Sequence, residues 1–170
     1  MRIGLGFDAH RFDSSRPLVL GGVTIPDAPG LAGHSDADIV SHALADALLG
    51  AANLGDLGAF FPATEQWRDA SSLEILHAAT ERVVDAGWMV ANVDVTIICE
   101  RPRLAFWQSD MMIRVARALG IDAGAVSIKS TTTDGLGFTG RGEGAAAIAV
   151  VLVEEAPDPT QNNARAWERR

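Results

Sequence analysis

The first strand-like segment of the chain carries an acid and an imidazole two residues apart. The run GLGFDAH, residues 4–10, lies in an alternating pattern that predicts a β-strand. Side chains at positions i and i+2 of a strand point to the same face, so Asp8 and His10 share one face. The opposite face then carries four apolar residues, Ile3, Leu5, Phe7 and Ala9. Such a pair is either the solvated end of a half-buried strand or two arms of a metal chelate.

A third potential ligand lies on the first predicted helix. Asp38, His42 and Asp46 recur every four residues, which places them in one polar stripe along an otherwise apolar helix. With Asp8 and His10, the imidazole of His42 would complete a set of ligands that borderline divalent metals prefer. Three protein ligands leave one tetrahedral position open, as is typical of catalytic zinc sites. The alternative is a solvated helix face and an ordinary histidine at a strand end.

Other polar residues near this stripe have less definite roles. Asp46, one turn from His42, is expected either to orient a ligand imidazole or only to contact solvent. His34 precedes Ser35, the predicted start of the helix, where free N–H groups and the helix dipole attract anions. His77 lies on the second predicted helix, apart from the candidate ligands Asp8, His10 and His42, so the sequence does not indicate that it is a ligand.

Two glycine-rich segments and a threonine run invite comparison with phosphate-binding loops. The GLG at 4–6 lacks the third glycine and the following helix of a dinucleotide-binding fingerprint. The segment GLGFTGRGEG, 135–144, leads into a strand and lacks the lysine of a P-loop. Before it, STTTD at 130–134 offers hydroxyls that bind phosphate oxygens and a carboxylate suited to a hard cation such as Mg²⁺. A simple β-favouring edge is the alternative for this run.

Hydrophobic periodicity indicates the elements that must position these groups. Strands are predicted at 2–12 and on both sides of a Gly21–Gly22 turn within 17–26. A helix is predicted from Ser35, with a capping-box-like Asp38, to near Gly55. Further along, the patterns predict helices at 71–86 and 104–119 and strands within 91–100, 125–131 and 145–153.

The order of these elements predicts the fold class. The strand, helix and strand within 92–131 form a βαβ unit. The complete order favours an α+β or α/β fold with a small mixed sheet and helices packed on one side. The strand at 145–153 is apolar on both faces, so both faces should be covered, one of them by another subunit if the helices do not suffice.

Composition limits the kinds of protein that the chain can be. Its 170 residues predict a single domain, which we place at 1–155, followed by a polar tail at 156–170 that we expect to be mobile. A net charge of −8 argues against general nucleic-acid binding. The single cysteine, Cys99, excludes an internal disulfide and fits a reducing compartment, so we expect a cytoplasmic protein. No apolar run is long enough to suggest a membrane span.

Four segments, taken together and in order, resemble a known enzyme family. They are GFDAH at 6–10, LAGHSDADIVSHALADALLGAANLGDLGAFFP at 31–62, NVDVTII at 92–98 and STTTDGLGFTGRGEG at 130–144. These segments resemble the 2-C-methyl-D-erythritol 2,4-cyclodiphosphate synthase family of non-mevalonate isoprenoid biosynthesis. The similarity runs from the first residue to the end of the apolar segment 145–153 and leaves only the tail outside.

The resemblance implies a homotrimer of ferredoxin-like α+β subunits whose sheets face a central axis, with active sites between subunits. It implies zinc on Asp8, His10 and His42, and a second divalent cation, Mg²⁺ or Mn²⁺, at Asp134 with the substrate diphosphate. His34 and Thr132 match transition-state stabilisers. The positions that match substrate contacts are Asp8, His10, His34, Ser35, Asp56, Leu57, Gly58, Phe61, Pro62, Ala63, Thr64, Glu65, Cys99, Glu100, Arg101, Pro102, Arg103, Leu104, Ala105, Thr131, Thr132, Thr133, Asp134, Phe138 and Arg141.

Several residues depart from the family pattern. Asp134 stands where a glutamate is common, so a shorter arm must approach the second cation more closely or bind it through water. Ala63 and Glu65 replace two aspartates, and Ser71–Ser72 stands where Asp-Ser is usual. The segment 101–111 differs from a familiar Pro-Lys-Leu-x-Pro-His-Ile pattern. The three zinc ligands are unchanged.

The reaction implied by the resemblance is an intramolecular phosphoryl transfer. In 4-diphosphocytidyl-2-C-methyl-D-erythritol 2-phosphate, an oxygen of the 2-phosphate attacks the β-phosphorus, closes a cyclic diphosphate and expels CMP. Such a reaction needs charge neutralisation and alignment more than a strong base. Two alternatives stay open: a zinc hydrolase, and a non-catalytic trimer that holds an isoprenoid phosphate around its axis with Phe7, Arg141 and Glu143.

Overall fold

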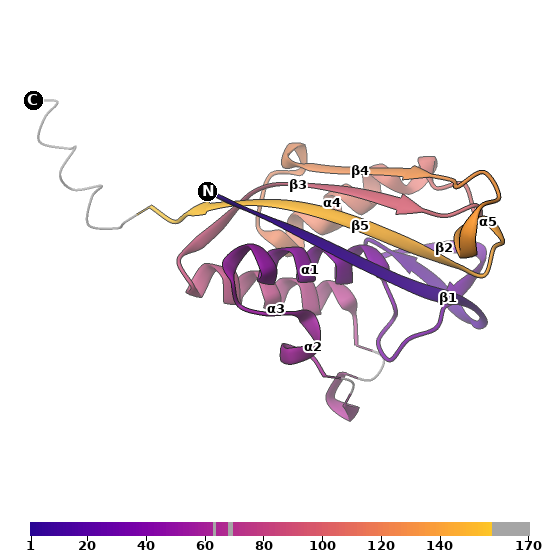
Figure 1. Ribbon diagram of the computed structural model, residues 1–170, viewed down its shortest axis with the longest axis horizontal. Coiled ribbons are helices and arrows are strands. Elements are labelled where there is room, and N and C mark those ends of the chain that lie inside the picture. The colour runs from indigo at the N-terminus through magenta and orange to yellow at the C-terminus, as the bar shows by residue number, and fades with distance from the viewer. Residues whose placement is uncertain (63, 68–69, 158–170) are drawn as a thin grey trace, which may run out of the picture.

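The structure is a computed structural model that describes residues 1–62, 64–67 and 70–157 (Figure 1). The strands and α-helices, in chain order, are β1 (Arg2–Leu20), β2 (Val23–Leu31), α1 (Ile39–Ala52), α2 (Leu57–Phe60), α3 (Ser72–Asp85), β3 (Trp88–Ile98), α4 (Gln108–Leu119), β4 (Val126–Thr131), α5 (Gly137–Gly140) and β5 (Gly144–Glu155). Short 3-10 helices lie at Glu65–Trp67, Ala105–Trp107 and Ala123–Ala125.

The strands form one mixed sheet in the order β2-β1-β5-β3-β4. β1 pairs antiparallel with β2 and β5, β5 pairs antiparallel with β3, and β3 pairs parallel with β4. The helices α1 and α3 lie together on one side of the sheet in Figure 1. The predicted α+β class with a mixed sheet is therefore confirmed, and so is the βαβ unit formed by β3, α4 and β4.

The first strand is longer than its sequence pattern predicted. Instead of separate strands at 2–12 and 17–20, β1 runs without a break from Arg2 to Leu20. It pairs with β5 up to Arg11 and with β2 from Phe12 onward, and the pairing with β2 has register shifts between Asp13 and Leu18. Polar residues at this irregularity hid the continuity. The Gly21–Gly22 turn is as predicted, with φ of 55° and 73°.

The helix α1 begins later than predicted. Its N-cap is Asp38 and not Ser35, because the Asp38 carboxylate accepts the N–H groups of Val40 at 3.0 Å and Ser41 at 3.3 Å. The helix ends at Ala52, where the chain turns into a left-handed conformation. Asp38 is fully buried and so does not belong to the polar stripe that the sequence suggested.

The other predicted elements are all present, but three differ in their limits: β2 continues to Leu31, β3 begins at Trp88, and α4 starts late. α3 and β4 begin and end within a residue or two of their predicted limits, and β5 is slightly longer. α4 starts at Gln108 instead of residue 104, because a 3-10 turn precedes it. Of the predicted tail at 156–170, the part from residue 158 onward lies outside the described residues.

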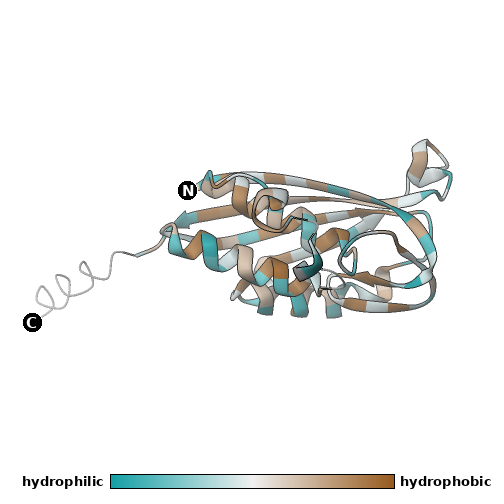
Figure 2. Ribbon diagram, turned by 90° about the horizontal axis from the view of Figure 1, so that it is seen from below, coloured by the Kyte–Doolittle hydropathy of each residue, from teal (hydrophilic) through white to brown (hydrophobic). Residues whose placement is uncertain are grey.

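The two faces of the sheet differ in how they are covered. The core lies under the helices, and eleven of the fourteen residues of α1 are buried there. Figure 2 shows hydrophobic residues along the strands and recurring hydrophilic residues along the helices. The opposite face exposes Ile3, Leu5 and Phe7, which are 71%, 70% and 54% accessible. Within one chain, therefore, the prediction that β5 is covered on both faces is not met, since Val150 is 38% accessible.

The described residues contain no helix that is both long and apolar enough to cross a bilayer.

Candidate metal centre and active site

Two glycines allow α1 to lie against β1 at backbone contact. A Cβ atom added to Gly6 would lie 2.0 Å from the carbonyl oxygen of Ala43, and one added to Gly4 would lie 1.8 Å from that of Ala47. Only glycine fits at either position. The GLG motif is thus explained by helix packing and not by phosphate binding. Because His42 directly precedes Ala43, the close approach brings its imidazole to the face of β1 that carries Asp8.

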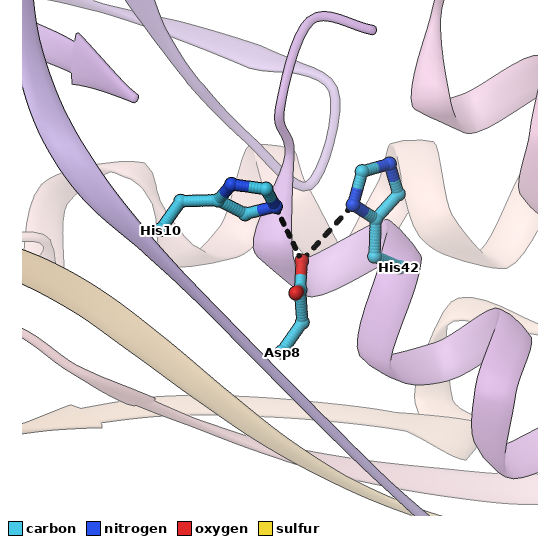
Figure 3. A group of neighbouring side chains, drawn as sticks. All are labelled: Asp8, His10 and His42. Carbon is cyan, nitrogen blue, oxygen red and sulfur yellow. Dashed lines mark hydrogen bonds and ion pairs between the residues drawn. The ribbon is translucent and has the colours of Figure 1, made fainter. Parts of the chain in front are cut away.

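Asp8, His10 and His42 converge in the structure as their spacing predicted (Figure 3). Asp8 Oδ2 lies 3.2 Å from His10 Nε2 and 3.0 Å from His42 Nδ1. One ligand atom from each of the three residues lies within 4.8 Å of the others. Their side chains are 12–24% accessible, so the group is sheltered but can be reached from solvent.

The outer nitrogen of each imidazole is held by the surrounding protein. His10 Nδ1 lies 2.6 Å from the carbonyl oxygen of Ala32, which can only accept, so this nitrogen carries the proton. His42 Nε2 lies 2.9 Å from Ser72 Oγ and 3.1 Å from Ser35 Oγ. The inner nitrogens therefore face the Asp8 carboxylate together. Two imidazole nitrogens and one carboxylate oxygen around a single point fit a borderline divalent metal such as zinc.

Asp8 and His10 shift each other's pKa values, and His42 also acts on the pKa of Asp8. Burial alone would raise the pKa of Asp8, but hydrogen bonds from His10 and His42 and the attraction of both rings hold this pKa well below its usual range. The hydrogen bond to Asp8 raises the pKa of His10, against the opposing effect of burial. The Asp8 carboxylate is therefore ionised across the neutral range, as a metal ligand must be.

The loop before α1 holds His34 in a different setting from the predicted one. Since the helix starts at Ile39, His34 does not lie at a helix N-terminus, so the prediction that Ser35 caps the helix beside it is wrong. Its Nε2 atom instead lies 2.6 Å from the carbonyl oxygen of Thr64. The Arg16 guanidinium donates to the carbonyl of Gly33 at 2.6 Å and to that of Ser35. These two hydrogen bonds hold the loop against β1.

The segment after α1 is positioned by two aspartates. Asp46 Oδ1 accepts the N–H of Leu57 at 2.8 Å, so it neither orients a ligand imidazole nor merely contacts solvent, the two roles expected from sequence. Asp56 caps α2 by accepting the N–H of Ala59 at 2.9 Å, and Gly58 lies within that helix. Beyond α2, the Phe61 ring stacks edge-on against Trp67.

The residues beyond Phe61 include more of the implied substrate contacts. Pro62, Thr64 and Glu65 are exposed, as a substrate-contacting segment requires. Ala63, which also matches a substrate-contacting position, lies outside the described residues.

A second group of candidate residues lies where β3 and β4 end. A cleft of ≈ 1040 Å³ is lined by Glu100, Arg101, Pro102, Arg103, Thr132 and Arg141, with others. Glu100 joins its two loops, because its Oε1 atom accepts the N–H groups of Thr133 at 2.9 Å and Gly135 at 3.3 Å. Thr132 donates to Asp134 at 3.2 Å. The cleft therefore contains cations, hydroxyls and a carboxylate, as a diphosphate site requires.

Asp134, which stands where the family commonly has glutamate, has an unusual backbone conformation. Asp134 has φ of 52°, in the left-handed region that aspartate tolerates better than most residues. Its carboxylate is accessible at the rim of the loop.

Some residues of this second group can offer only backbone groups. Cys99 and Leu104 are buried, with 5% and 2% of their surfaces accessible, and Cys99 donates its thiol hydrogen to the carbonyl of Arg101. Burial raises the pKa of the Cys99 thiol, so it is not a nucleophile. Phe138 is 40% accessible and Arg141 pairs with Glu143 at 2.7 Å. Ala105 and Thr131, also expected contacts, are exposed at the ends of this region.

Comparison with known proteins decides which family has this arrangement. The model of the YgbB family matches residues 1–154. The chain belongs to the YgbB family. The 2-C-methyl-D-erythritol 2,4-cyclodiphosphate synthase of Salinibacter ruber is 54% identical over 157 residues, which are 92% of this chain and 100% of that protein. The same-named protein of Moorella thermoacetica is 55% identical and is covered over 94% of its length.

Solved structures of the family share the fold of this chain. A 2C-methyl-D-erythritol-2,4-cyclodiphosphate synthase in its CDP-bound form superposes with a TM-score of 0.82 at 34% identity, covering 90% of this chain and all of the other. The bifunctional IspDF of Campylobacter jejuni gives a TM-score of 0.87 at 39% identity, covering 91% of this chain and 42% of that larger protein. The resemblance seen in the sequence is thereby confirmed.

Within this family member, two groups of candidate residues stand apart in the chain. One contains Asp8, His10, His42 and Ser35, and the other lines the cleft at the ends of β3 and β4. None of the three clustered ligands lines that cleft. The sequence did not predict two contacts near His42: Ser72 contacts the His42 ring, and Asp36 accepts the Ser72 hydroxyl. Their only signal was the presence of small polar residues before two helices.

Proposed function

We propose that the chain catalyses the cyclisation of 4-diphosphocytidyl-2-C-methyl-D-erythritol 2-phosphate to 2-C-methyl-D-erythritol 2,4-cyclodiphosphate, with release of CMP. The 2-phosphate oxygen forms a bond to the β-phosphorus as the bond from that phosphorus to the CMP oxygen breaks. One observation carries the proposal: Asp8, His10 and His42 converge in a chain that is 54% identical to a relative with this activity in its name.

The cluster of Asp8, His10 and His42 would hold zinc, which when bound supplies Lewis-acid polarisation of a phosphate oxygen. The remaining work falls to residues that align two phosphates of like charge on one substrate. Alignment of reacting groups in a single molecule can contribute up to ~7–11 kcal/mol. The loop containing His34 and Ser35 adjoins the zinc ligands, so it is placed to hold the 2-phosphate end.

The second cleft would hold the diphosphate and the cytosine end. Asp134 is the proposed ligand of Mg²⁺ or Mn²⁺ together with the diphosphate, and Thr132 the proposed donor to the oxygens that gain charge in the transition state. The segment Cys99–Ala105 is proposed to hold cytosine largely through backbone groups, consistent with its buried Cys99 and Leu104 side chains. The segments 56–58 and 61–65 and residues 131–134, Phe138 and Arg141 are the other proposed contacts.

The assembly proposed for this activity is a homotrimer of ferredoxin-like subunits. It is supported by the exposed apolar face formed by Ile3, Leu5 and Phe7, since monomers rarely expose such a patch. Three facing sheets would cover this patch and would bring the zinc group of one subunit to the cleft of the next. A cavity on the axis, near Phe7, Arg141 and Glu143, is a proposed site for an isoprenoid phosphate. The reducing cytoplasm is the proposed location, in keeping with the free Cys99.

A direct assay tests this function. The purified protein is incubated with the cytidyl substrate and Mg²⁺, before and after zinc is removed by a chelator, and the products are followed by phosphorus NMR. We expect CMP and a cyclic diphosphate before chelation and neither afterwards. His42→Ala should abolish turnover, while His77→Ala, on an exposed face of α3, should not. A linear product would indicate a hydrolase instead, and no turnover by zinc-loaded protein would indicate a binding module.

A further inference from the structure

A chain of hydrogen bonds runs from His42 into the protein, behind the proposed metal. His42 Nε2, the ring nitrogen that faces away from Asp8, lies 2.9 Å from Ser72 Oγ. Ser72 Oγ donates its proton to Asp36 Oδ1, and the other oxygen of Asp36 accepts the Ser72 backbone N–H at 3.1 Å. This relay connects α1, the first residue of α3 and the loop before α1.

The single proton of a hydroxyl group fixes the direction of the relay. An ionised carboxylate only accepts, so the Ser72 proton goes to Asp36 and the remaining capacity of Ser72 Oγ is to accept. It is therefore able to accept an Nε2–H from His42. In this structure Nδ1 hydrogen-bonds to Asp8 Oδ2 at 3.0 Å. In a neutral ring that keeps its proton on Nε2, Nδ1 would instead direct a lone pair at the point shared with Asp8 and His10, as metal binding requires.

We propose that Asp36 and Ser72 are positioning residues that hold the proton of His42 on Nε2 and so keep Nδ1 free to bind a metal ion. The inference rests on the metal site of the proposed function, although neither residue is one of the three clustered ligands. Histidines that bind metals usually donate their second ring N–H to a carboxylate or carbonyl. Here a serine hydroxyl transmits the effect of the carboxylate, and Ser72 is fully buried, so water does not compete.

Two substitutions would break the relay at different points. Ser72→Ala removes the acceptor nearest to His42 Nε2 and leaves only Ser35 Oγ at 3.1 Å. Ser72 donates both its backbone N–H and its hydroxyl to Asp36. Asp36→Asn leaves one acceptor oxygen for these two donors, so the hydroxyl becomes free to donate to His42 Nε2 instead. That reversal would favour a proton on Nδ1, the atom that must bind the metal.

Zinc affinity is the first measurement, made by competition with a chromophoric chelator on the full chain. Ser72→Ala and Asp36→Asn should each weaken zinc binding about 10-fold or more, the usual cost of losing a partner of a metal-bound histidine. Ser71→Ala is the matched control, because Ser71 is the neighbouring residue at the start of α3 and its side chain makes no cap hydrogen bond. This control should bind zinc as the parent does.

The ring proton itself is the second measurement. In zinc-loaded protein labelled with ¹⁵N-histidine, the His42 Nε2–H should appear as a slowly exchanging signal, and in Ser72→Ala it should exchange faster and shift. Unchanged affinity and an unchanged ring signal in both variants would overturn the proposal. An equal loss of affinity in Ser71→Ala would also overturn it, since the effect would then come from disturbance of α3.

The outcomes separate this inference from the proposed function. A parent protein that binds zinc and shows the relay but does not cyclise the substrate would refute the function alone. A protein that cyclises the substrate while both relay variants keep full zinc affinity would refute the relay alone. Thermal melting of each variant shows whether Asp36→Asn still folds, and if it does not, Ser72→Ala decides the question.

Discussion

At the scale of single residues, the Asp38 carboxylate connects two elements that are distant along the chain. It accepts the N–H groups of Gly21 at 2.9 Å and Gly22 at 2.8 Å in the turn between β1 and β2. It also caps α1 and accepts the hydroxyl of Ser41 at 2.8 Å. Because Asp38 is fully buried, these donors would have no water to replace it.

Replacement of Asp38 should therefore destabilise the protein strongly. We expect Asp38→Ala to lower the free energy of unfolding by about 2–4 kcal/mol, from the lost helix cap and the unpaired buried N–H groups. Asp122→Ala is the control, because Asp122 caps only a short exposed 3-10 turn through the N–H of Gly124. Its cost should be at most about 1 kcal/mol. Urea denaturation measures both, and equal losses would show that the turn contacts of Asp38 contribute nothing.

The metal ligands were predictable from sequence, whereas their supporting residues were not. On a strand, the two-residue spacing of Asp8 and His10 places both side chains on one face, and His42 lies in a clear helical pattern. Asp36 and Ser72, in contrast, are 36 residues apart and meet only because α3 begins beside the loop before α1. A contact between two segment ends leaves no periodic signal in the sequence.

At the scale of elements, the contact between β1 and α1 determines the geometry of the metal group. A Cβ at Gly6 would lie 2.0 Å from the carbonyl oxygen of Ala43, so Gly6→Ala must push the helix away from the strand. We expect a loss of about 1–3 kcal/mol in stability from this overpacking. Zinc should also bind more weakly, because His42 moves with the helix and Asp8 stays with the strand.

Gly50→Ala is the matched control for this substitution. Gly50 lies in the same helix, but an added Cβ would have no atom within 4 Å. Alanine should there stabilise the helix by about 0.5–1 kcal/mol and leave zinc affinity unchanged. Thermal melting and chelator competition measure the two effects, and a Gly6→Ala protein with parental zinc affinity would contradict the expected coupling.

The two loops of the second cleft depend on Glu100. A single oxygen of its side chain, Oε1, accepts the N–H groups of Thr133 and Gly135 and the hydroxyl of Thr133. Glu100→Ala should release the loop that carries Asp134 and lower kcat, while Glu100→Gln should retain most activity because the amide keeps one acceptor oxygen. Steady-state kinetics compare the two. Equal losses in both variants would indicate that the negative charge matters and not the acceptor.

At the scale of the whole molecule, the sheet has one face that the chain does not cover. Hydrophobic alternation in β1 predicted that Ile3, Leu5 and Phe7 share a face, but it did not reveal that this face lies opposite the helices. The reason is that Gly4 and Gly6, with no side chains, occupy the face that packs against α1. The apolar residues of this strand thus point away from the core of their own chain. The usual expectation that apolar side chains are buried within the chain does not hold for them.

A charge placed on this face should separate the subunits of the proposed trimer. Leu5→Arg puts a cation in the centre of the patch, where burial against another sheet would leave it unpaired. We expect a monomer by sedimentation velocity that still binds zinc, because Asp8, His10 and His42 come from one chain. It should lack cyclase activity, since the second cleft of the same chain does not contain the zinc ligands. Val84→Arg, on the exposed side of α3, should leave both assembly and activity intact. A Leu5→Arg protein that remains trimeric would place the subunit contact elsewhere, and an active monomer would show that a single chain holds the complete site.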